Sequence, residues 1–460
     1  MTSKYPTWST VHAPVLPVVG LLVCLLVVAS CGPAPAVSGP GTPASPVSPG
    51  ASRASAGGSS SAPASPSGLG GLIPATVTTD RQWYTLPDGL ATPTVIVRAT
   101  FASDPAAGAP AAAIGERGTP VSLQRDGTAW TASLPLTGVA PGTYEVRILE
   151  RIGTAAEIAG RAVVRISAPE YVVWTLDFEG DASGDPELTN AAAIADGLHV
   201  PMVVFWNPRA WTTDQVSRER QDAMLAWTTG RLAKGDEVAL HLHLWTDYVR
   251  AAGLIPRLQP SWAGRGDGYD VPLTAYPEED QRTLIAYGSR LMVEHGLPRP
   301  TSFRAGGDIG DAATLRAAAA AGFTVDCTAV PQSAPPIGRI PFPWTLARDA
   351  QPYFPSRTDA NVPGDLPLLE SPTIGPNTYA ATVGSIQPYV RAAQALFAPA
   401  GQIATERRTI DLVSHPGTIV PAERAAIELY LHTFDALRYD ADRGPVRFVT
   451  LQDLAKAYSR

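Results

Sequence analysis

The C-terminal part of the chain, from residue 171 onward, alternates short apolar runs with longer helix-like segments. The apolar runs that we expect to form strands are residues 172–176, 201–205, 237–243, 302–303, 324–326, 410–414 and 446–450, and the segments that we expect to form helices are residues 189–196, 214–232, 278–294, 311–321, 385–397 and 421–439. Strands that alternate with helices form a parallel sheet, and about seven such units predict a (β/α) barrel. The active site of such a barrel lies at the C-terminal ends of its strands.

The N-terminus has the pattern of a targeting segment. Residues 15–30 read VLPVVGLLVCLLVVAS and carry no charge; this run is shorter than the roughly 20 apolar residues that span a bilayer and is typical of a signal-peptide core. It ends in Val28-Ala29-Ser30-Cys31, which resembles the lipobox of bacterial lipoproteins. We therefore expect residues 1–30 to be a signal peptide, Cys31 to be lipidated, and the remainder to be exported and anchored to the outer face of the bacterial cell membrane. The alternative is an uncleaved apolar anchor.

A linker and a small β domain are expected before the barrel. In residues 32–70, 34 of 39 are Ala, Pro, Ser or Gly, too few apolar groups to offset chain entropy, so residues 31–72 are predicted to be a disordered linker. Residues 73–168 contain alternating apolar and polar runs separated by turns, which predicts an antiparallel immunoglobulin-like sandwich. We expect this sandwich to be a spacer; the alternative is a binding module, with Trp83, Tyr84 and Trp130 as contact candidates.

An acidic motif follows the first strand expected in the barrel. Asp177 and Glu179 come directly after residues 172–176, with Asp181 on the next loop. Alternation along a strand places Asp177 and Glu179 on one face. Paired carboxylates at a strand end can serve as a general base and a metal ligand. The alternative is a helix-capping or solvated acidic loop.

Two histidines end a later strand. Residues 237–243 read EVALHLH, so His241 and His243 are two positions apart and point to the same side of the strand. Two imidazoles in this arrangement can share one ion. A single histidine is more often structural, but this spacing at a strand end favours a metal site.

Two further motifs follow short apolar runs. The motif Phe303-Arg304-Ala305-Gly306-Gly307-Asp308 contains an arginine that could hold an active-site carboxylate in its charged form, and glycines that let the backbone approach a ligand. His415 ends the strand expected at residues 410–414, and its ordinary pKa near neutrality suits a general acid. Each motif taken alone also fits a structural role.

The four motifs, in this order, resemble those of the NodB-like polysaccharide deacetylases, carbohydrate esterase family four, over about residues 170–458. The resemblance implies a distorted (β/α)7 barrel, here residues 169–460, and one divalent metal, most often Zn²⁺, bound by one carboxylate and two histidines. It also implies removal of N-acetyl groups from amino sugars of chitin-like, peptidoglycan or exopolysaccharide chains.

The resemblance assigns the first motif residue by residue. Asp177 corresponds to the catalytic base. The family's metal carboxylate directly follows the base, but Phe178 occupies that position here. Glu179 is therefore expected to be the metal carboxylate, with Asp181 as the second choice.

His241 and His243 correspond to the two metal histidines. The family's usual spacing is H-x-x-x-H, so the H-x-H form leaves the second ligand open, and Asp247 is an alternative.

The last motifs are assigned in the same way. Arg304 corresponds to the arginine that pairs with the base, and His415 to the histidine that protonates the leaving amine. Asp326 resembles the acid that tunes this histidine.

Several classes of function are excluded by what the chain lacks. Its formal net charge of -7, from 35 basic and 42 acidic residues, is unsuited to binding nucleic acid. The chemistry that the resemblance implies needs no organic cofactor, and no Gly-rich phosphate loop is visible. A serine esterase is not expected, because G-x-S-x-G is absent. The expected partner is a polysaccharide, with aromatic side chains near the strand ends available to stack on sugars: Trp206, Trp211, Trp245, Trp262 and Tyr269. Two alternatives stay open: a barrel hydrolase of another amide or ester, and a catalytically inactive glycan-binding lipoprotein.

Overall fold

The computed structural model describes residues 71–459 except 106–107, 153 and 336–337. The signal peptide, Cys31 and nearly all of the linker expected from the sequence lie outside the described residues. Within the described part, no helix is both long and apolar enough to cross a bilayer.

Residues 75–167 form two β-sheets. The first has the order β1 (Ala75–Thr79), β3 (Thr94–Phe101), β7 (Ala129–Pro135) and β6 (Gln124–Asp126), and the second has the order β2 (Trp83–Thr85), β9 (Ala155–Ser167), β8 (Gly142–Ile152), β4 (Ala111–Ile114) and β5 (Val121–Ser122). All pairings are antiparallel except that of β2 with β9. Alternate residues such as Val95, Val97 and Ala99 are fully buried in one apolar cluster. Trp83 and Tyr84 are also buried, so neither is an exposed sugar contact.

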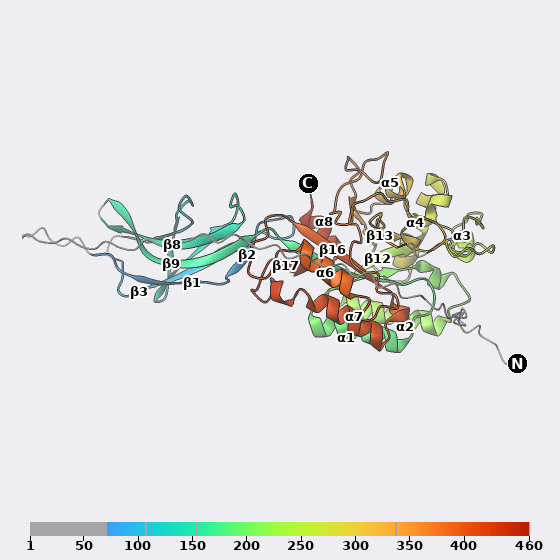
Figure 1. Cartoon of the computed structure of the whole chain (residues 1–460), viewed down its shortest axis with the longest axis horizontal. Coiled ribbons are helices and arrows are strands. Elements are labelled where there is room, and N and C mark those ends of the chain that lie inside the picture. Colours follow the sequence, from blue (N-terminus) through green and yellow to red (C-terminus); the bar gives the residue numbers. More distant parts are fainter. Residues whose placement is uncertain (1–70, 106–107, 153, 336–337, 460) are drawn as a thin grey trace, which may run out of the picture. The chain divides into compact units, whose positions relative to one another are not determined.

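The remaining chain forms one parallel sheet of eight strands (Figure 1). Its order is β15 (Leu369–Glu370), β14 (Val325–Asp326), β13 (Ser302–Ala305), β12 (Glu237–Leu242), β11 (Met202–Trp206), β10 (Glu170–Asp177) and β16 (Arg408–Ser414), with β17 (Val446–Phe448) also paired to β10. Seven strands were expected from apolar runs. The additional strand is the two-residue β15, which was not expected.

Helices follow most of the strands. They are α1 (Asp185–Leu198), α2 (Arg218–Leu232), α3 (Thr246–Ala251), α4 (Glu278–Glu294), α5 (Ala312–Ala320), α6 (Gln387–Leu396), α7 (Pro421–His432) and α8 (Leu451–Ala457). Local capping explains several starts: Ser217 and Asp311 accept hydrogen bonds from backbone N–H groups in the first turns of α2 and α5. The helix expected over residues 421–439 ends earlier, at His432, where the chain turns into a short 3-10 segment. Figure 1 shows α1 beside α7 and α4 beside α5.

Strand alternation divides the barrel into an inner and an outer layer. Tyr171 and Val173 of β10 belong to an interior cluster together with Phe205, whereas Val172 and Trp174 belong to the outer cluster that the helices cover. Every residue of β10 is buried, as expected for a parallel strand with both faces covered. Because Asp177 continues the inward series, its side chain points into the barrel at the C-terminal end.

The sheet has its edges at β15 and β16, and the segment after β15 bridges them. The Thr373 N–H donates to the Ala329 carbonyl at 2.8 Å, and the Gly375 N–H donates to the Asp411 carbonyl at 2.9 Å. This segment therefore completes the wall of the barrel without forming a regular strand, which agrees with a distorted (β/α) barrel.

A buried acid, Glu237, lies at the N-terminal end of β12, and its titration is expected to affect the stability of the fold. Glu237 is 5% exposed; its carboxylate accepts hydrogen bonds from the Ser302 hydroxyl and, at 2.8 Å, from the Gln452 N–H. Burial raises the pKa of Glu237 from its ordinary value of 4.5 to about 7. Because the folded state favours the neutral acid, Glu237 contributes its full stabilisation to the folded protein below about pH 4.5. This contribution is lost as the pH rises through 7.

We therefore expect Glu237→Gln to make stability less dependent on pH. Relative to wild type, the variant should gain about 3 kcal/mol in the free energy of unfolding between pH 4.5 and pH 8, because each pKa unit corresponds to about 1.4 kcal/mol. Urea unfolding of both proteins at the two pH values measures this difference. Parallel changes in both proteins would contradict the prediction.

Candidate active site

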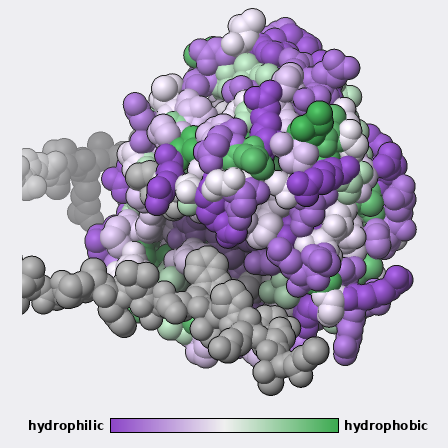
Figure 2. Space-filling model, turned by 90° about the vertical axis from the view of Figure 1, so that its right-hand side faces the viewer, coloured by the Kyte–Doolittle hydropathy of each residue, from purple (hydrophilic) through white to green (hydrophobic). Residues whose placement is uncertain are grey.

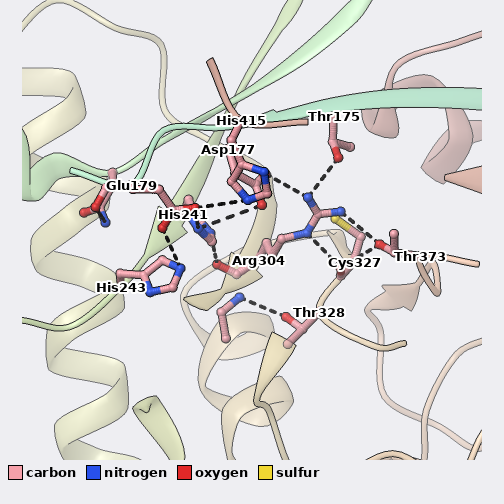
Figure 3. A network of polar contacts seen from close by, with 12 residues as sticks. Thr175, Asp177, Glu179, His241, His243, Arg304, Cys327, Thr328, Thr373 and His415 are labelled. Carbon is pink, nitrogen blue, oxygen red and sulfur yellow. Dashed lines mark hydrogen bonds and ion pairs between the residues drawn. The ribbon is translucent and has the colours of Figure 1, made fainter. Parts of the chain in front are cut away.

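Side chains from four strand ends meet at the C-terminal mouth of the barrel (Figure 3). Asp177 ends β10 and Glu179 follows it, His241 and His243 lie at the end of β12, Arg304 is in β13, and His415 follows β16. Phe178, between the two acids, points outward, is 2% exposed and packs against Trp206 with a ring separation of 5.3 Å. The alternation explains why the metal carboxylate is expected at Glu179 rather than directly after Asp177.

Arg304 and Asp177 form a buried ion pair. The Arg304 Nη1 donates to Asp177 Oδ1 at 2.8 Å and to the Thr175 hydroxyl at 2.8 Å. Its Nη2 donates to the Thr373 hydroxyl at 3.0 Å. Burial alone would lower the pKa of Arg304, but the negative groups around it, Asp177 first among them, together raise it. Arg304 is thus a permanent cation that occupies Oδ1 of Asp177 and leaves Oδ2 facing His241 at 3.9 Å.

Two overlapping groups of potential ligand atoms converge beside this pair. Glu179, His241 and His243 form one group, and Asp177, Glu179 and His415 form the other; within each group the atoms lie within 4.8 Å of one another. The Nε2 of His243 is 2.8 Å from Glu179 Oε2, and the Nε2 of His241 is 3.9 Å from Glu179 Oε1. The structure therefore brings together all three residues expected from the sequence as metal ligands.

His241 provides a test of whether a cation fits here. Its Nε2 is buried and has no hydrogen-bond partner among the described residues, while its Nδ1 is 3.1 Å from the Arg304 carbonyl oxygen. A buried nitrogen without a partner is costly unless a ligand satisfies it. Two imidazoles and a carboxylate are the donor set of many catalytic zinc sites. The residues present therefore fit a divalent metal.

The electrostatics of Glu179 and His243 agree with this assignment. Burial alone would raise the pKa of Glu179, but His243 and His241 hold it well below its usual range. For His243, burial alone would lower the pKa, but Asp270 and Glu179 raise it well above the usual range. The carboxylates of Glu179 and Asp270 thus face His243 from both sides, and a metal ion bound here would displace a proton from this ring.

His415 lies on the opposite side of Glu179 from His243. Its Nε2 is 3.3 Å from Glu179 Oε1, and its ring contacts the edge of the exposed Tyr379 ring at a centroid distance of 5.7 Å. Burial lowers the pKa of His415, and the carboxylates of Glu179 and Asp177 oppose that effect. This placement leaves Nε2 directed toward Glu179 and the converging ligand atoms.

Asp326 does not contact His415, which corrects the role implied by the resemblance. Its carboxylate accepts a hydrogen bond from the Thr328 hydroxyl at 2.8 Å and lies next to Glu370 on β15. Burial raises the pKa of both acids. Within the part of the chain that the structure describes, the Nδ1 of His415 is buried without a hydrogen-bond partner. The reason is the register of β14, which pairs Asp326 with Glu370 of β15 and places its carboxylate beside the Thr328 hydroxyl.

Asp247 and Asp181 also lie outside the converging groups. Asp247 forms an ion pair at 2.9 Å with Arg209, which is fully buried and whose guanidinium also stacks over the Trp245 ring. Asp247 is therefore committed to a structural cation and is not available as the second metal ligand. Asp181 is exposed on the loop after Glu179.

The surroundings of the site include aromatic residues and a cavity. Trp206 is 1% exposed and belongs to the core, so it is not a sugar contact. Trp262 is half-buried, with its ring 6.4 Å from that of His243. A cavity of about 1030 Å³ adjoins the site, because Asp308 and Thr373 form part of its lining. Figure 2, which views the end of the molecule toward which the barrel strands run, shows a mainly hydrophilic face.

Two residues near the site were not expected from the sequence. Asp270 contacts His243, although it lies 27 residues away in a loop without a recognisable motif. Asp308 ends the motif that begins at Phe303, and the sequence suggested no function for it. Burial raises the pKa of Asp308 to about 6. No periodicity marks either position, since loops bring them to the site.

Comparison with known proteins identifies similar structures but no similar sequence. No protein-family model matches the chain, and no curated protein sequence matches it. Its structure is similar to that of a Mycobacterium smegmatis protein provisionally described as a polysaccharide deacetylase (15% identity, TM-score 0.39, 63% of this chain and 89% of that one). It is also similar to a family 4 acetyl xylan esterase from Clostridium thermocellum in complex with a cobalt ion (14%, 0.30, 62% and 89%), and to a 4-alpha-glucanotransferase from Thermococcus litoralis (10%, 0.37, 63% and 40%). At such identities and scores, these likenesses say nothing of the activity.

Proposed function

We propose that the chain is a metal-dependent hydrolase that removes N-acetyl groups from amino sugars of a cell-wall or extracellular polysaccharide. The observation that carries the proposal is the arrangement at the strand ends: a carboxylate–arginine pair, a cluster of two histidines and a carboxylate, and a third histidine across from them. This arrangement combines a proton acceptor, a cation site and a proton donor. The order of the four motifs in the sequence supports the same chemistry.

Glu179, His241 and His243 are the residues that would hold the ion. Two nitrogen donors and one oxygen donor suit Zn²⁺, the metal that the sequence resemblance implies. When bound, such an ion supplies Lewis acidity for an amide carbonyl and lowers the pKa of a water.

The other residues of the site provide the proton transfers. Asp177 accepts the proton of the attacking water on Oδ2, because Oδ1 is occupied by Arg304. Arg304 also holds the orientation of Asp177 through its bonds to Thr175 and Thr373. His415 donates a proton from Nε2 to the departing amine. This nitrogen is 3.3 Å from Glu179 Oε1, so it is within reach of an acetamide group that lies beside Glu179.

Acetate release tests the proposal directly. The purified protein is incubated with N-acetylated and O-acetylated glycans, with and without a chelator, and free acetate is measured. We expect release from an N-acetylated glycan that the chelator stops and added zinc restores. Release of acetate from O-acetylated glycans alone would identify an O-acetyl esterase and contradict the proposed N-deacetylation. Glycan binding without release and without bound metal would identify a catalytically inactive protein.

We also propose that the protein is exported and anchored to the outer face of the cell membrane through a lipid on Cys31. The support is the apolar run that ends in a lipobox-like sequence. Cys31→Ala is expected to abolish lipidation, because the thiol receives the lipid, so metabolic labelling with a fatty acid should disappear and the protein should stay unprocessed or leave the membrane. Persistence of membrane association with no change in processing would indicate an apolar anchor instead.

A further inference from the structure

His243 is held from its outer side by a residue to which nothing so far has assigned a role. The Nδ1 of His243 is 2.6 Å from Oδ1 of Asp270, and its Nε2 is 2.8 Å from Glu179. Asp270 is 5% exposed and is located in the loop between α3 and α4. The ring of His243 is therefore fixed at both nitrogens.

The second histidine has a different outer partner. The Nδ1 of His241 is 3.1 Å from the backbone carbonyl oxygen of Arg304. The Arg304 carbonyl oxygen and Asp270 Oδ1 both accept a hydrogen bond from the Nδ1 of their histidine. The Nε2 of each ring is therefore the nitrogen that faces the cation site. A carboxylate partner, unlike a carbonyl, carries a full negative charge, and it makes the opposite nitrogen a stronger electron donor. The two histidines are thus unequal ligands, and His243 is the stronger donor.

The loop holds Asp270 in place through its backbone. Asp270 has a φ of 57°, in the left-handed region that few residues other than glycine adopt. Its carbonyl accepts a hydrogen bond from the Trp262 N–H at 2.8 Å, and the next N–H, of Val271, donates to the Leu244 carbonyl at 3.2 Å. These two backbone hydrogen bonds hold the loop in the conformation that directs the carboxylate at His243.

The other side of the His243 ring is closed by Gly306. A Cβ at this position would lie 2.7 Å from Cγ and 2.8 Å from Nδ1 of His243, closer than real contacts allow. A larger residue would force the His243 ring and the Leu242 carbonyl, also 2.7 Å from that Cβ, to shift. Gly306 therefore explains part of the Arg304 motif: it provides the room that the His243–Asp270 contact needs.

We propose that Asp270 is a positioning residue for the metal site, which orients His243 and strengthens its Nε2 as a metal ligand. This inference rests on the proposed function, since it concerns the same site. Asp270 does not touch the substrate and acts only through His243.

The affinity for Zn²⁺ tests this role. Metal-free wild type, Asp270→Asn and Asp267→Asn are titrated with Zn²⁺ against a chromophoric chelator, and the visible spectrum of each Co²⁺-loaded protein is recorded. Asp267 is a matched control because it is exposed in the same loop and pairs with Arg265. We expect the dissociation constant to rise 10- to 100-fold in Asp270→Asn, the Co²⁺ bands to shift, and excess zinc to restore activity. Asp267→Asn should match wild type in all three measurements.

The possible results separate this inference from the proposed function. Unchanged zinc affinity and an unchanged Co²⁺ spectrum in Asp270→Asn would overturn the role of Asp270. If the His241→Ala/His243→Ala double variant also kept its zinc, the assignment of the metal to Glu179, His241 and His243 would be contradicted, and with it the proposed function. Thermal unfolding of the metal-free proteins checks folding; if Asp270→Asn fails to fold, Asp270→Ser provides the same comparison, because the backbone bonds of the loop are retained.

Discussion

Replacement of both His241 and His243 by alanine is expected to abolish zinc retention and acetate release. Both nitrogens of the proposed site are lost, and the remaining carboxylates of Glu179 and Asp177 cannot hold zinc with comparable affinity. Since the site is at the mouth of the barrel and the apolar layers below it are unchanged, the fold should persist. Metal analysis after gel filtration and the acetate assay measure the two effects.

The control for this experiment is a histidine away from the site. His432 is at the end of α7, half exposed, and pairs with Asp435 at 2.7 Å. His432→Ala should keep both metal and activity. Full metal occupancy in the double variant would show that the ion, if present, is held elsewhere.

Replacement of Asp177 by asparagine is expected to lower turnover by about 10²- to 10⁴-fold, the usual contribution of a positioned general base. An amide preserves the shape of the side chain, and its oxygen can still accept the hydrogen bond from Arg304. Zinc affinity should change little, because Glu179, His241 and His243 remain. Steady-state kinetics with saturating zinc, together with a zinc titration, test both statements.

The matching variant, Glu179→Gln, is expected to show the opposite pattern. It should weaken zinc binding first, and added zinc should restore part of the activity. If Asp177→Asn lost the metal and Glu179→Gln did not, the two acids would exchange roles. If neither variant affected activity, the end of β10 would not be part of the active site.

The sequence predicted the residues on strands better than those on loops. Asp177, His241, Arg304 and His415 each end an apolar run or lie within one, and strand alternation alone puts their side chains on the inner face. Parallel strands in a barrel then bring these ends together. Asp326 satisfied the same criteria, but its place in the strand order puts it beside Glu370 rather than His415, and strand order is not encoded in any local pattern.

The sequence by itself determined the alternation of strands and helices, the inward direction of the strand-end residues, and the outward direction of Phe178, because these follow from periods of two and 3.6 residues. Only the tertiary structure decided which polar groups are available to bind a ligand and which are engaged with other residues. It engages Asp247 with the buried Arg209, and it leaves Nε2 of His241 without a hydrogen-bond partner in residues 71–459 as described. It also brings Asp270 to within 2.6 Å of His243. These contacts join segments distant in the chain, and they depend on how loops pack over the barrel mouth, where no periodic pattern constrains the sequence.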